Sequence, residues 1–383
     1  MVSERKTRVG IVGTGFIARG LSYALQNDLS LDISRVLTRR NPEQVKGLAV
    51  EERQITASSH ELIDESDIIV ECSGDPVYAT GIVSEAMDAG LKVVTMDSEL
   101  HITSGSWLAK KGFITEAEGD QPGSIAAFYK EVVEMGFEPI VLGNIKGFLN
   151  RTPVENEMKY WATKQGISLN QVIAFTDGTK IQIEQALVAN GLGADIAQRG
   201  MLGIECIDHQ DGAKRLAERA GSLGTTISDY VLSPKSPAGV FITAKHKAEQ
   251  APYLKYLKLG DGPYYVLTRP FHLCHLEISK TIKQVLRGEG VLLNNGVNPQ
   301  ISVATIAKRK LIPGEIIKRG IGSFTVRGEA IKIAENPQHV PIGLVSNAVL
   351  KRYVEPGQII NFDDVEIPES QALVAWQETI KQR

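Results

Sequence analysis

The sequence predicts an α/β protein with a parallel β-sheet in its N-terminal part, and three observations support this prediction. Short β-rich runs alternate with helical runs over residues 8–125, which is typical of strand–helix–strand units. A glycine-containing loop connects the first of these runs to the first helix. Hydrophobic residues make up 43% of the chain and charged residues 23%, so the chain can bury enough apolar surface to fold.

The N-terminal elements follow from hydrophobic spacing and from turn residues. Ile17, Leu21 and Leu25 recur at helical spacing on one side of a single run. Gly90 after another run is a good helix C-cap. The expected strands are Arg8–Val12, Leu31–Leu37, Asp67–Glu71 and Lys92–Met96, and the expected helices are Phe16–Gln26, His60–Asp64 and Val77–Ala89.

The remainder of the chain reads as a mixed α+β region followed by a β-rich tail. The mixed region has expected helices at Ile125–Gly136, Pro153–Gly166, Thr179–Leu192 and Gly212–Ala220, and expected strands at Glu138–Gly143, Tyr264–Leu267 and Ile301–Ile306. Pro-Gly and Arg-Gly turns punctuate the last 70 or so residues. We expect three domains, at residues 1–130, 131–309 and 310–383.

Composition limits the classes of partner. With 42 basic and 45 acidic side chains the net charge is −3, and no long basic block is present, which argues against nucleic acid. No window approaches the roughly 18 apolar residues of a membrane span, and no signal peptide is evident. Cys72, Cys206 and Cys274 form no CxxC pair, so a cytoplasmic location is expected. A homo-oligomer, dimer or tetramer, is the default assembly.

The loop after the first strand has the spacing Gly-x-Gly-x-x-Ala. Gly13 permits a tight turn, Gly15 lets the backbone approach a pyrophosphate, and Ala18 allows close packing of helix and strand. A strand before the loop and a helix after it complete the dinucleotide-binding fingerprint of a Rossmann-type sheet; the alternative is a plain tight turn. The predicted contacts to the cofactor are Gly13, Thr14, Gly15, Phe16 and Ile17.

Cofactor choice is expected to follow from the end of the second strand. This strand ends without the Asp or Glu that binds an NAD ribose, and Arg39 and Arg40 follow it. Arginine suits a 2′-phosphate, which favours NADP, with NAD possible. The alternative is that both arginines form a solvated corner.

Two later strand ends are also expected to meet the cofactor, because ligands of open α/β sheets bind beyond the carboxyl ends of the strands. The residues concerned are Cys72, Ser73, Gly74, Thr95 and Met96. For Cys72 a buried, inert thiol is the favoured interpretation.

The segment Val93–Glu99 and the glycine loop together resemble the homoserine dehydrogenase superfamily. This resemblance implies a nucleotide-binding fold over the first 150 residues. Ser98 stands at the position where that superfamily has a catalytic lysine.

A second resemblance covers nearly the whole chain. Gly143–Gly147, Phe175–Lys180 and Arg269–Glu277 are similar to a bacterial group of homoserine dehydrogenase-related oxidoreductases. That group includes enzymes like 1-deoxy-D-xylulose 5-phosphate reductoisomerase and commonly ends in a SAF domain. Val340–Leu344 and Val354–Val365 resemble the SAF pattern. The resemblance implies a C-terminal SAF-like domain and an NAD(P)-dependent enzyme.

Lys146 and Lys180 are the leading catalytic candidates, because each is expected to follow a β-run and to lie in a glycine-containing turn. A lysine there can polarise a carbonyl, protonate an alkoxide or bind a phosphate. Asp177 is expected to orient Lys180 or bind a substrate hydroxyl, or else to cap the helix that begins near Thr179. The alternative for both lysines is ordinary surface exposure, and Glu184 is expected to form a surface i,i+4 pair with Lys180.

Four further residues are expected to bind substrate: Asn144, Glu99, Arg269 and His272. The alternative for Asn144 is a turn residue, and that for His272 is a structural histidine. Arg269 can hold a carboxylate or phosphate through paired donors. His272 and His275 have no third ligand at a recognised spacing, so no metal is predicted.

These observations favour an NADPH-dependent oxidoreductase that transfers hydride to or from a small polar, possibly phosphorylated, hydroxy or keto compound. One alternative is a reductoisomerase of a sugar phosphate. The other is a non-catalytic nucleotide- or sugar-binding module.

Overall fold

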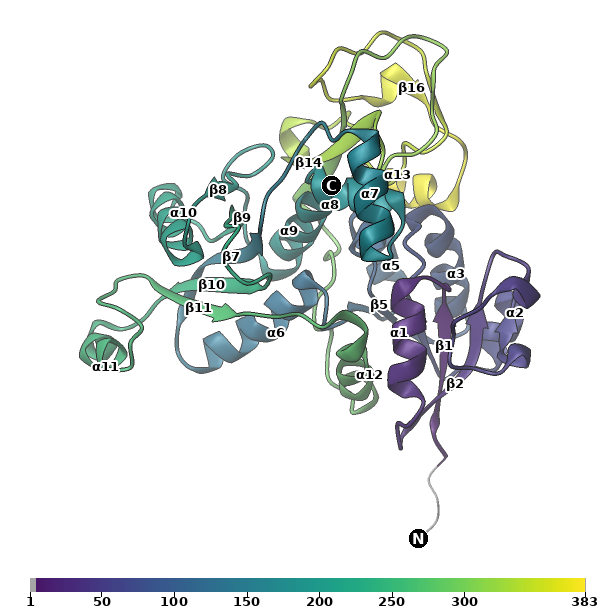
Figure 1. Ribbon diagram of the computed structural model, residues 1–383, viewed down its shortest axis with the longest axis horizontal. Coiled ribbons are helices and arrows are strands. Elements are labelled where there is room, and N and C mark those ends of the chain that lie inside the picture. The colour runs from purple at the N-terminus through teal and green to yellow at the C-terminus, as the bar shows by residue number, and fades with distance from the viewer. Residues whose placement is uncertain (1–4, 383) are drawn as a thin grey trace. The chain divides into compact units, whose positions relative to one another are not determined.

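The computed structural model describes residues 5–382, and its contacts group them into two compact units (Figure 1). Unit 1 comprises residues 5–123, 273–298 and 370–382, and unit 2 comprises residues 124–272 and 299–369. Both units are therefore assembled from separate stretches of the chain. The expected division at residues 1–130, 131–309 and 310–383 stays a prediction.

Unit 1 contains a six-stranded sheet in which every neighbouring pair is parallel. Its strand order is β3-β2-β1-β4-β5-β6, so the direction of winding reverses between β1 and β4. The strands are β1 (Thr7–Val12), β2 (Leu31–Leu37), β3 (Ile55–Thr56), β4 (Ile68–Glu71), β5 (Lys92–Thr95) and β6 (Ile114–Glu116). This is the order of a Rossmann-type sheet, and the predicted fold class is confirmed.

Helices pack against this sheet or against one another around it. They are α1 (Phe16–Leu25), α2 (Ser59–Asp64), α3 (Pro76–Asp88), α4 (Ser98–Leu100), α5 (Ser106–Lys111), α12 (Ile278–Leu286) and α13 (Gln371–Lys381). A π-helical turn, η3 (His101–Gly105), joins α4 to α5. The short 3-10 turn η5 (Cys274–Leu276) leads into α12.

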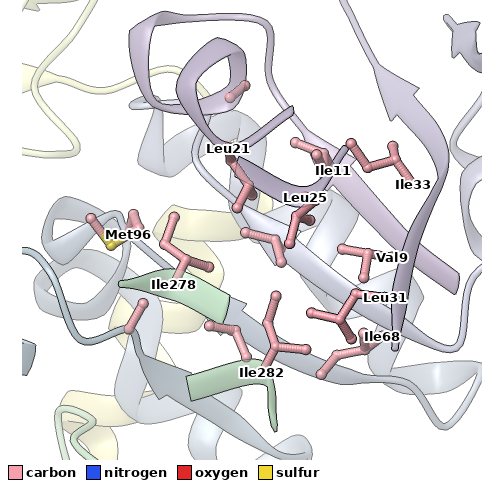
Figure 2. Packing of buried hydrophobic residues seen from close by; sticks show 14 of the residues in the cluster. Val9, Ile11, Leu21, Leu25, Leu31, Ile33, Ile68, Met96, Ile278 and Ile282 are labelled. Atoms are coloured by element: carbon pink, nitrogen blue, oxygen red, sulfur yellow. The ribbon is translucent and has the colours of Figure 1, made fainter. Parts of the chain in front are cut away.

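One hydrophobic core of unit 1 joins distant parts of the sequence (Figure 2). Val9 and Ile11 of β1 pack with Leu21 of α1 and with Ile278 and Ile282 of α12. The buried residues of α12 recur at helical spacing, so one face of this short helix is apolar. The sheet therefore depends on a helix that begins at Ile278, whereas the last strand of the sheet ends at Glu116.

Unit 2 is built on a five-stranded mixed sheet with the order β11-β10-β7-β9-β8. Its strands are β7 (Glu138–Lys146), β8 (Ile204–Glu205), β9 (Ile227–Leu232), β10 (Val240–Lys245) and β11 (Tyr265–Arg269). Its helices are α6 (Gln121–Glu134), which starts at the unit boundary, α7 (Glu155–Gln165), α8 (Leu169–Thr176), α9 (Thr179–Leu192), α10 (His209–Leu223) and α11 (Ala251–Tyr256).

The C-terminal β-rich stretch, residues 299–369, belongs to unit 2. It contains the antiparallel pair β12 (Ile301–Ala307) and β14 (Val326–Lys332), and the three-stranded sheet β13 (Ile316–Ile317), β15 (Ala348–Leu350) and β16 (Val365–Glu366). Helix α9 packs against β12 and β14 and also against β7 and β9, so every residue from Thr179 to Ala189 is buried. Among the elements that the sequence interpretation missed are the strands β3, β6, β8, β9 and β10 and the helices α5, α8, α11, α12 and α13.

Candidate functional site

Unit 1 carries a candidate nucleotide site at the β1–α1 turn. Gly13 has φ +114°, and a Cβ at this position would lie 2.9 Å from the carbonyl oxygen of Cys72. Only glycine fits this close approach without strain. Gly15 caps α1 without any side-chain hydrogen bond, and a Cβ there would meet nothing within 4 Å. The start of α1 therefore has no side-chain cap and has room beside Gly15, and a helix N-terminus favours an anion.

Of the other residues predicted in this loop, Thr14 is buried whereas Phe16 is exposed. Ala18 is fully buried, as close packing of α1 on the sheet requires. Because Gly13, Gly15 and Ala18 each meet the demand of the fingerprint, the residues present fit a dinucleotide.

Arg39 lies at the carboxyl end of β2 beside a cavity. Its Nη1 lies 2.7 Å from Oδ2 of Asp75, and its guanidinium stands 4.5 Å from the ring centroid of Tyr78. The cavity has a volume of about 300 Å³ and is lined by Leu37, Thr38, Arg39, Ala57, Ser59, Tyr78 and Ile82. Arg40 is exposed, and its backbone N–H donates to Thr38 Oγ1. Arg39 alone of the two predicted arginines lines this cavity.

The ends of β4 and β5 form a buried polar cluster. Glu71 is fully buried and accepts hydrogen bonds from Thr95 Oγ1 at 2.8 Å and from the Ser73 N–H at 2.7 Å. Burial raises the pKa of Glu71, and the nearby charge of Glu99 adds to the increase. Thr95 thus supports Glu71, and the side chain of Met96 packs in the hydrophobic core.

Cys72 has the character of an inert thiol. Its Sγ donates to the Val12 carbonyl, and burial, followed by the charges of Glu71 and Asp97, raises its pKa far above the usual range. A nucleophilic thiol needs the opposite shift. Gly74 has φ +68° in the turn that follows, just before Asp75 caps α3.

Unit 2 carries a second candidate site, which unites three of the predicted residues. The Nζ of Lys146, at the end of β7, lies 3.8 Å from Oε2 of Glu184. The Nζ of Lys180, in the first turn of α9, lies 3.9 Å from Oε1 of the same carboxylate. Asn144 of β7 donates from Nδ2 to Glu184 Oε2 at 3.1 Å. One carboxylate thus lies between two ammonium groups.

This lysine site, defined as Asn144, Lys146, Lys180 and Glu184, is largely shielded from solvent. The side chain of Glu184 is 1% exposed, that of Lys180 11% and that of Lys146 19%. Asn144 is fully buried, and its Oδ1 accepts no hydrogen bond from the described residues. Phe175 lies beside the site, with its ring centroid 6.0 Å from the Lys146 ammonium. The site therefore combines ammonium donors, a buried acceptor and an adjacent aromatic ring.

Glu184 corrects the sequence interpretation, which placed it in a surface pair. Helix α9 is surrounded by β-strands, so the i,i+4 partner of Lys180 lies in the interior. The signal was present in the sequence: Ile181, Ile183 and Leu187 surround α9 with apolar residues, which is typical of a buried helix. A carboxylate in such a helix needs partners.

Asp177 also differs from its expected role as the orienting partner of Lys180. Its Oδ2 lies 2.6 Å from Nζ of Lys308, and its Oδ1 accepts the N–H of Thr179 at 2.8 Å, as in the alternative capping role. Burial raises the pKa of Asp177 and lowers that of Lys308, while the contact between opposite charges opposes both shifts. Lys308 was missed because no local pattern predicts a partner 131 residues away.

Arg269 and His272 occupy the end of β11 and the loop after it. The Arg269 guanidinium stands 5.4 Å from the ring centroid of Phe271. Glu99 lies in unit 1, close enough to Glu71 to affect its pKa. Within residues 5–382, no three His, Cys, Asp or Glu side chains lie where they could hold a metal ion. The same part of the chain contains no helix of the length and apolarity needed to cross a membrane.

Comparison with known families bears on the central part of the chain. Residues 119–278 match the family described as oxidoreductase DRL, catalytic domain. The expected enzyme class, oxidoreductase, is confirmed for this segment. The match contains β7, the first turn of α9 and therefore the whole lysine site.

Two curated relatives are meso-diaminopimelate D-dehydrogenases. That of Ureibacillus thermosphaericus is 26% identical over 52% of this chain and 61% of its own length. That of Lysinibacillus sphaericus is 22% identical over 52% of this chain and 60% of its own length. The chain thus spans about three fifths of these relatives.

Among solved structures, a hyperthermophilic archaeal homoserine dehydrogenase in complex with NADPH is 13% identical, with a TM-score of 0.46. The match covers 75% of this chain and 100% of the homoserine dehydrogenase chain. A probable dehydrogenase from Thermotoga maritima is 14% identical, with a TM-score of 0.43, over 75% of this chain and 91% of its own.

Proposed function

We propose that the protein is an NADP-dependent oxidoreductase that interconverts a hydroxyl and a carbonyl group on a small polar substrate. The observation that carries the proposal is the lysine site, in which Lys146 and Lys180 flank the buried carboxylate of Glu184. A hydride transfer at carbon requires a proton transfer at the attached oxygen, and an ammonium group can supply it. The family match over this segment supports the class of reaction.

The residues that would hold the cofactor lie in unit 1. The uncapped start of α1 would receive the pyrophosphate, and Arg39 would receive the 2′-phosphate. NADP, when bound, supplies or accepts the hydride. We base the preference for NADP on the position of Arg39 at the cavity beyond β2, and NAD remains the alternative cofactor.

At the lysine site, one ammonium group would donate its proton to the substrate oxygen as the carbonyl becomes a hydroxyl. The second ammonium would attract an anionic group such as a carboxylate or phosphate, because a lysine ammonium is a compact positive charge. The Oδ1 atom of Asn144 would accept a hydrogen bond from a substrate hydroxyl. Phe175 would cover an apolar part of the substrate.

The proposal extends to properties that the sequence suggested. It includes a homo-oligomer, either dimer or tetramer. It also includes a cytoplasmic location, since all three cysteines are free thiols. The SAF-like character of residues 310–383 is a further part. Light scattering on the purified protein measures the subunit number.

A panel assay tests the function. Candidate hydroxy acids, hydroxy phosphates and amino acids are incubated with NADP, and NADPH formation is followed by absorbance. We expect Lys146→Ala and Lys180→Ala to abolish turnover of the best substrate while NADPH affinity stays within about twofold. The control, Lys159→Ala, changes an exposed lysine of α7. Normal turnover in both site variants would contradict a catalytic role for these two lysines.

Product analysis separates the alternatives. A rearranged carbon skeleton in the product identifies a reductoisomerase. Tight NADPH binding without hydride transfer across the panel identifies a non-catalytic binding module.

A further inference from the structure

The Lys308–Asp177 pair connects the C-terminal β-rich stretch to the start of α9. The Lys308 side chain is 4% exposed and that of Asp177 is 0% exposed, with 2.6 Å between their charged atoms. Lys308 also donates to the carbonyl of Ser323. Asp177 in turn accepts the N–H of Thr179, the first residue of α9. The contacts therefore run from Lys308 to the residue that precedes Lys180.

A second contact from the same stretch reaches Thr179. The N–H of Gly328, in β14, donates to Thr179 Oγ1 at 2.9 Å. A Cβ on Gly328 would lie 3.2 Å from the Thr179 methyl group and 2.7 Å from Val303, so the absence of a side chain allows the approach. Two separate contacts from residues 299–369 thus fix the first turn of α9.

A buried ion pair is an expensive way to stabilise a fold, because desolvation offsets much of the attraction. Apolar side chains of similar volume would hold α9 equally well. What the pair adds is a defined position, since both charges must meet with good geometry. The residue placed by this geometry is Lys180, whose ammonium must lie near Glu184.

We propose that Lys308 is a positioning residue for Lys180, acting through Asp177 and the first turn of α9. The C-terminal β-rich stretch then contributes to the lysine site by positioning Lys180. The inference rests on the proposed function only in treating Lys180 as a site residue.

The test uses full-length protein and needs no substrate. Acetic anhydride labels lysines at rates that mass spectrometry resolves residue by residue. Lys308→Met leaves the Asp177 carboxylate buried without its partner, and we expect the Tm to fall by about 10 °C. The double variant Lys308→Met/Asp177→Asn removes both charges and is expected to recover most of this loss.

The decisive measurement is the labelling rate of Lys180 in the double variant. We expect its labelling rate to rise about tenfold, while the rate of Lys146 on β7 stays unchanged. The control, Lys332→Met/Asp195→Asn, removes a more exposed ion pair of 2.5 Å between the end of β14 and the turn after α9. This control is expected to leave Lys180 unchanged.

Two outcomes overturn the proposal: wild-type labelling of Lys180 in the stable double variant, or an equal increase in the control. The first would show that the pair only stabilises the fold. The second would show general loosening of α9. Because labelling does not depend on catalysis, these outcomes are separate from the loss or retention of turnover in Lys180→Ala.

Discussion

The carboxylate of Glu184 lies 3.8 Å from the ammonium of Lys146, although the two residues belong to α9 and β7. With Lys180 at 3.9 Å on its other oxygen, Glu184 is the shared counter-charge of the lysine site. Both ammonium groups lie in a place largely closed to water. Electrostatic attraction for an anionic group is stronger there than on an open surface.

Glu184→Gln tests this shared charge. The amide preserves the size of the side chain but removes its attraction for both ammonium groups. We expect turnover to fall at least about tenfold with little change in NADPH affinity, measured by steady-state kinetics and fluorescence titration. The control is Glu155→Gln, which removes the partner of exposed Lys159. Unchanged turnover in Glu184→Gln would contradict the role of the carboxylate.

Two glycine variants separate folding from cofactor binding. Gly13→Ala puts a side chain at φ +114° and 2.9 Å from a carbonyl oxygen, so both Tm and NADPH affinity should fall. Gly15→Ala meets no atom within 4 Å, so the Tm should stay constant. Its new methyl group lies where the pyrophosphate would approach, and we expect affinity to fall about tenfold. Equal NADPH affinity in Gly15→Ala and wild type would place the cofactor elsewhere.

Arg39→Ala tests the choice of cofactor. Loss of a charge-assisted contact to a 2′-phosphate should raise the Kd for NADPH about tenfold and leave that for NADH nearly unchanged. Arg40→Ala should have a smaller effect, because Arg40 does not line the cavity beyond β2. Isothermal titration measures the Kd for NADPH and the Kd for NADH in each of the two variants. A parallel loss of NADH binding in Arg39→Ala would argue for a structural role of the Asp75 contact.

Acid should destabilise the fold through His339. Burial lowers the pKa of His339 to about 4, and its two ring nitrogens contact the Asn336 carbonyl and Ser302 Oγ. Because the folded-state pKa lies below the unfolded value near 6.5, the unfolded chain takes up the proton first. Stability is complete above pH 6.5 and is lost as the pH falls toward 4.

At pH 5 this loss amounts to about 2 kcal/mol for His339. His101 adds a loss of the same sign, since burial lowers its pKa to about 3. Thermal unfolding of His339→Gln between pH 5 and 7 should show a shallower pH dependence than the wild type. Exposed His60→Gln serves as the control, and an unchanged slope in His339→Gln would refute the assignment.

Four of the six strands of the N-terminal sheet could be predicted from the sequence because their determinants are local, whereas the short edge strands β3 and β6 were missed. The run Leu31–Leu37 has the same bounds in sequence and structure, and the helix Thr179–Leu192 does too. Gly13 and Gly15 likewise owe their roles to a turn between adjacent elements. Hydrophobic period and turn residues are properties of neighbours in the chain.

The lysine site was predictable only in part. Lys146, Lys180 and Asn144 stood out individually, whereas Glu184 and Lys308 acquire their roles from burial of α9 between two sheets. For Asp177 the sequence allowed two roles, as a partner of Lys180 or as a helix cap. Its ion pair with Lys308, 131 residues away, could not be predicted. Long-range pairing of this kind leaves no periodic trace in a single sequence.

The contribution of α12 to the core of unit 1 bears on the order of events during synthesis. The six strands have all been synthesised once residue 116 is added, yet Ile278 and Ile282 complete the packing around Val9 and Leu21. Translation of the intervening residues takes on the order of ten seconds or more at typical rates. Throughout that interval the nascent sheet has an unfinished apolar face, which is a natural binding surface for a chaperone.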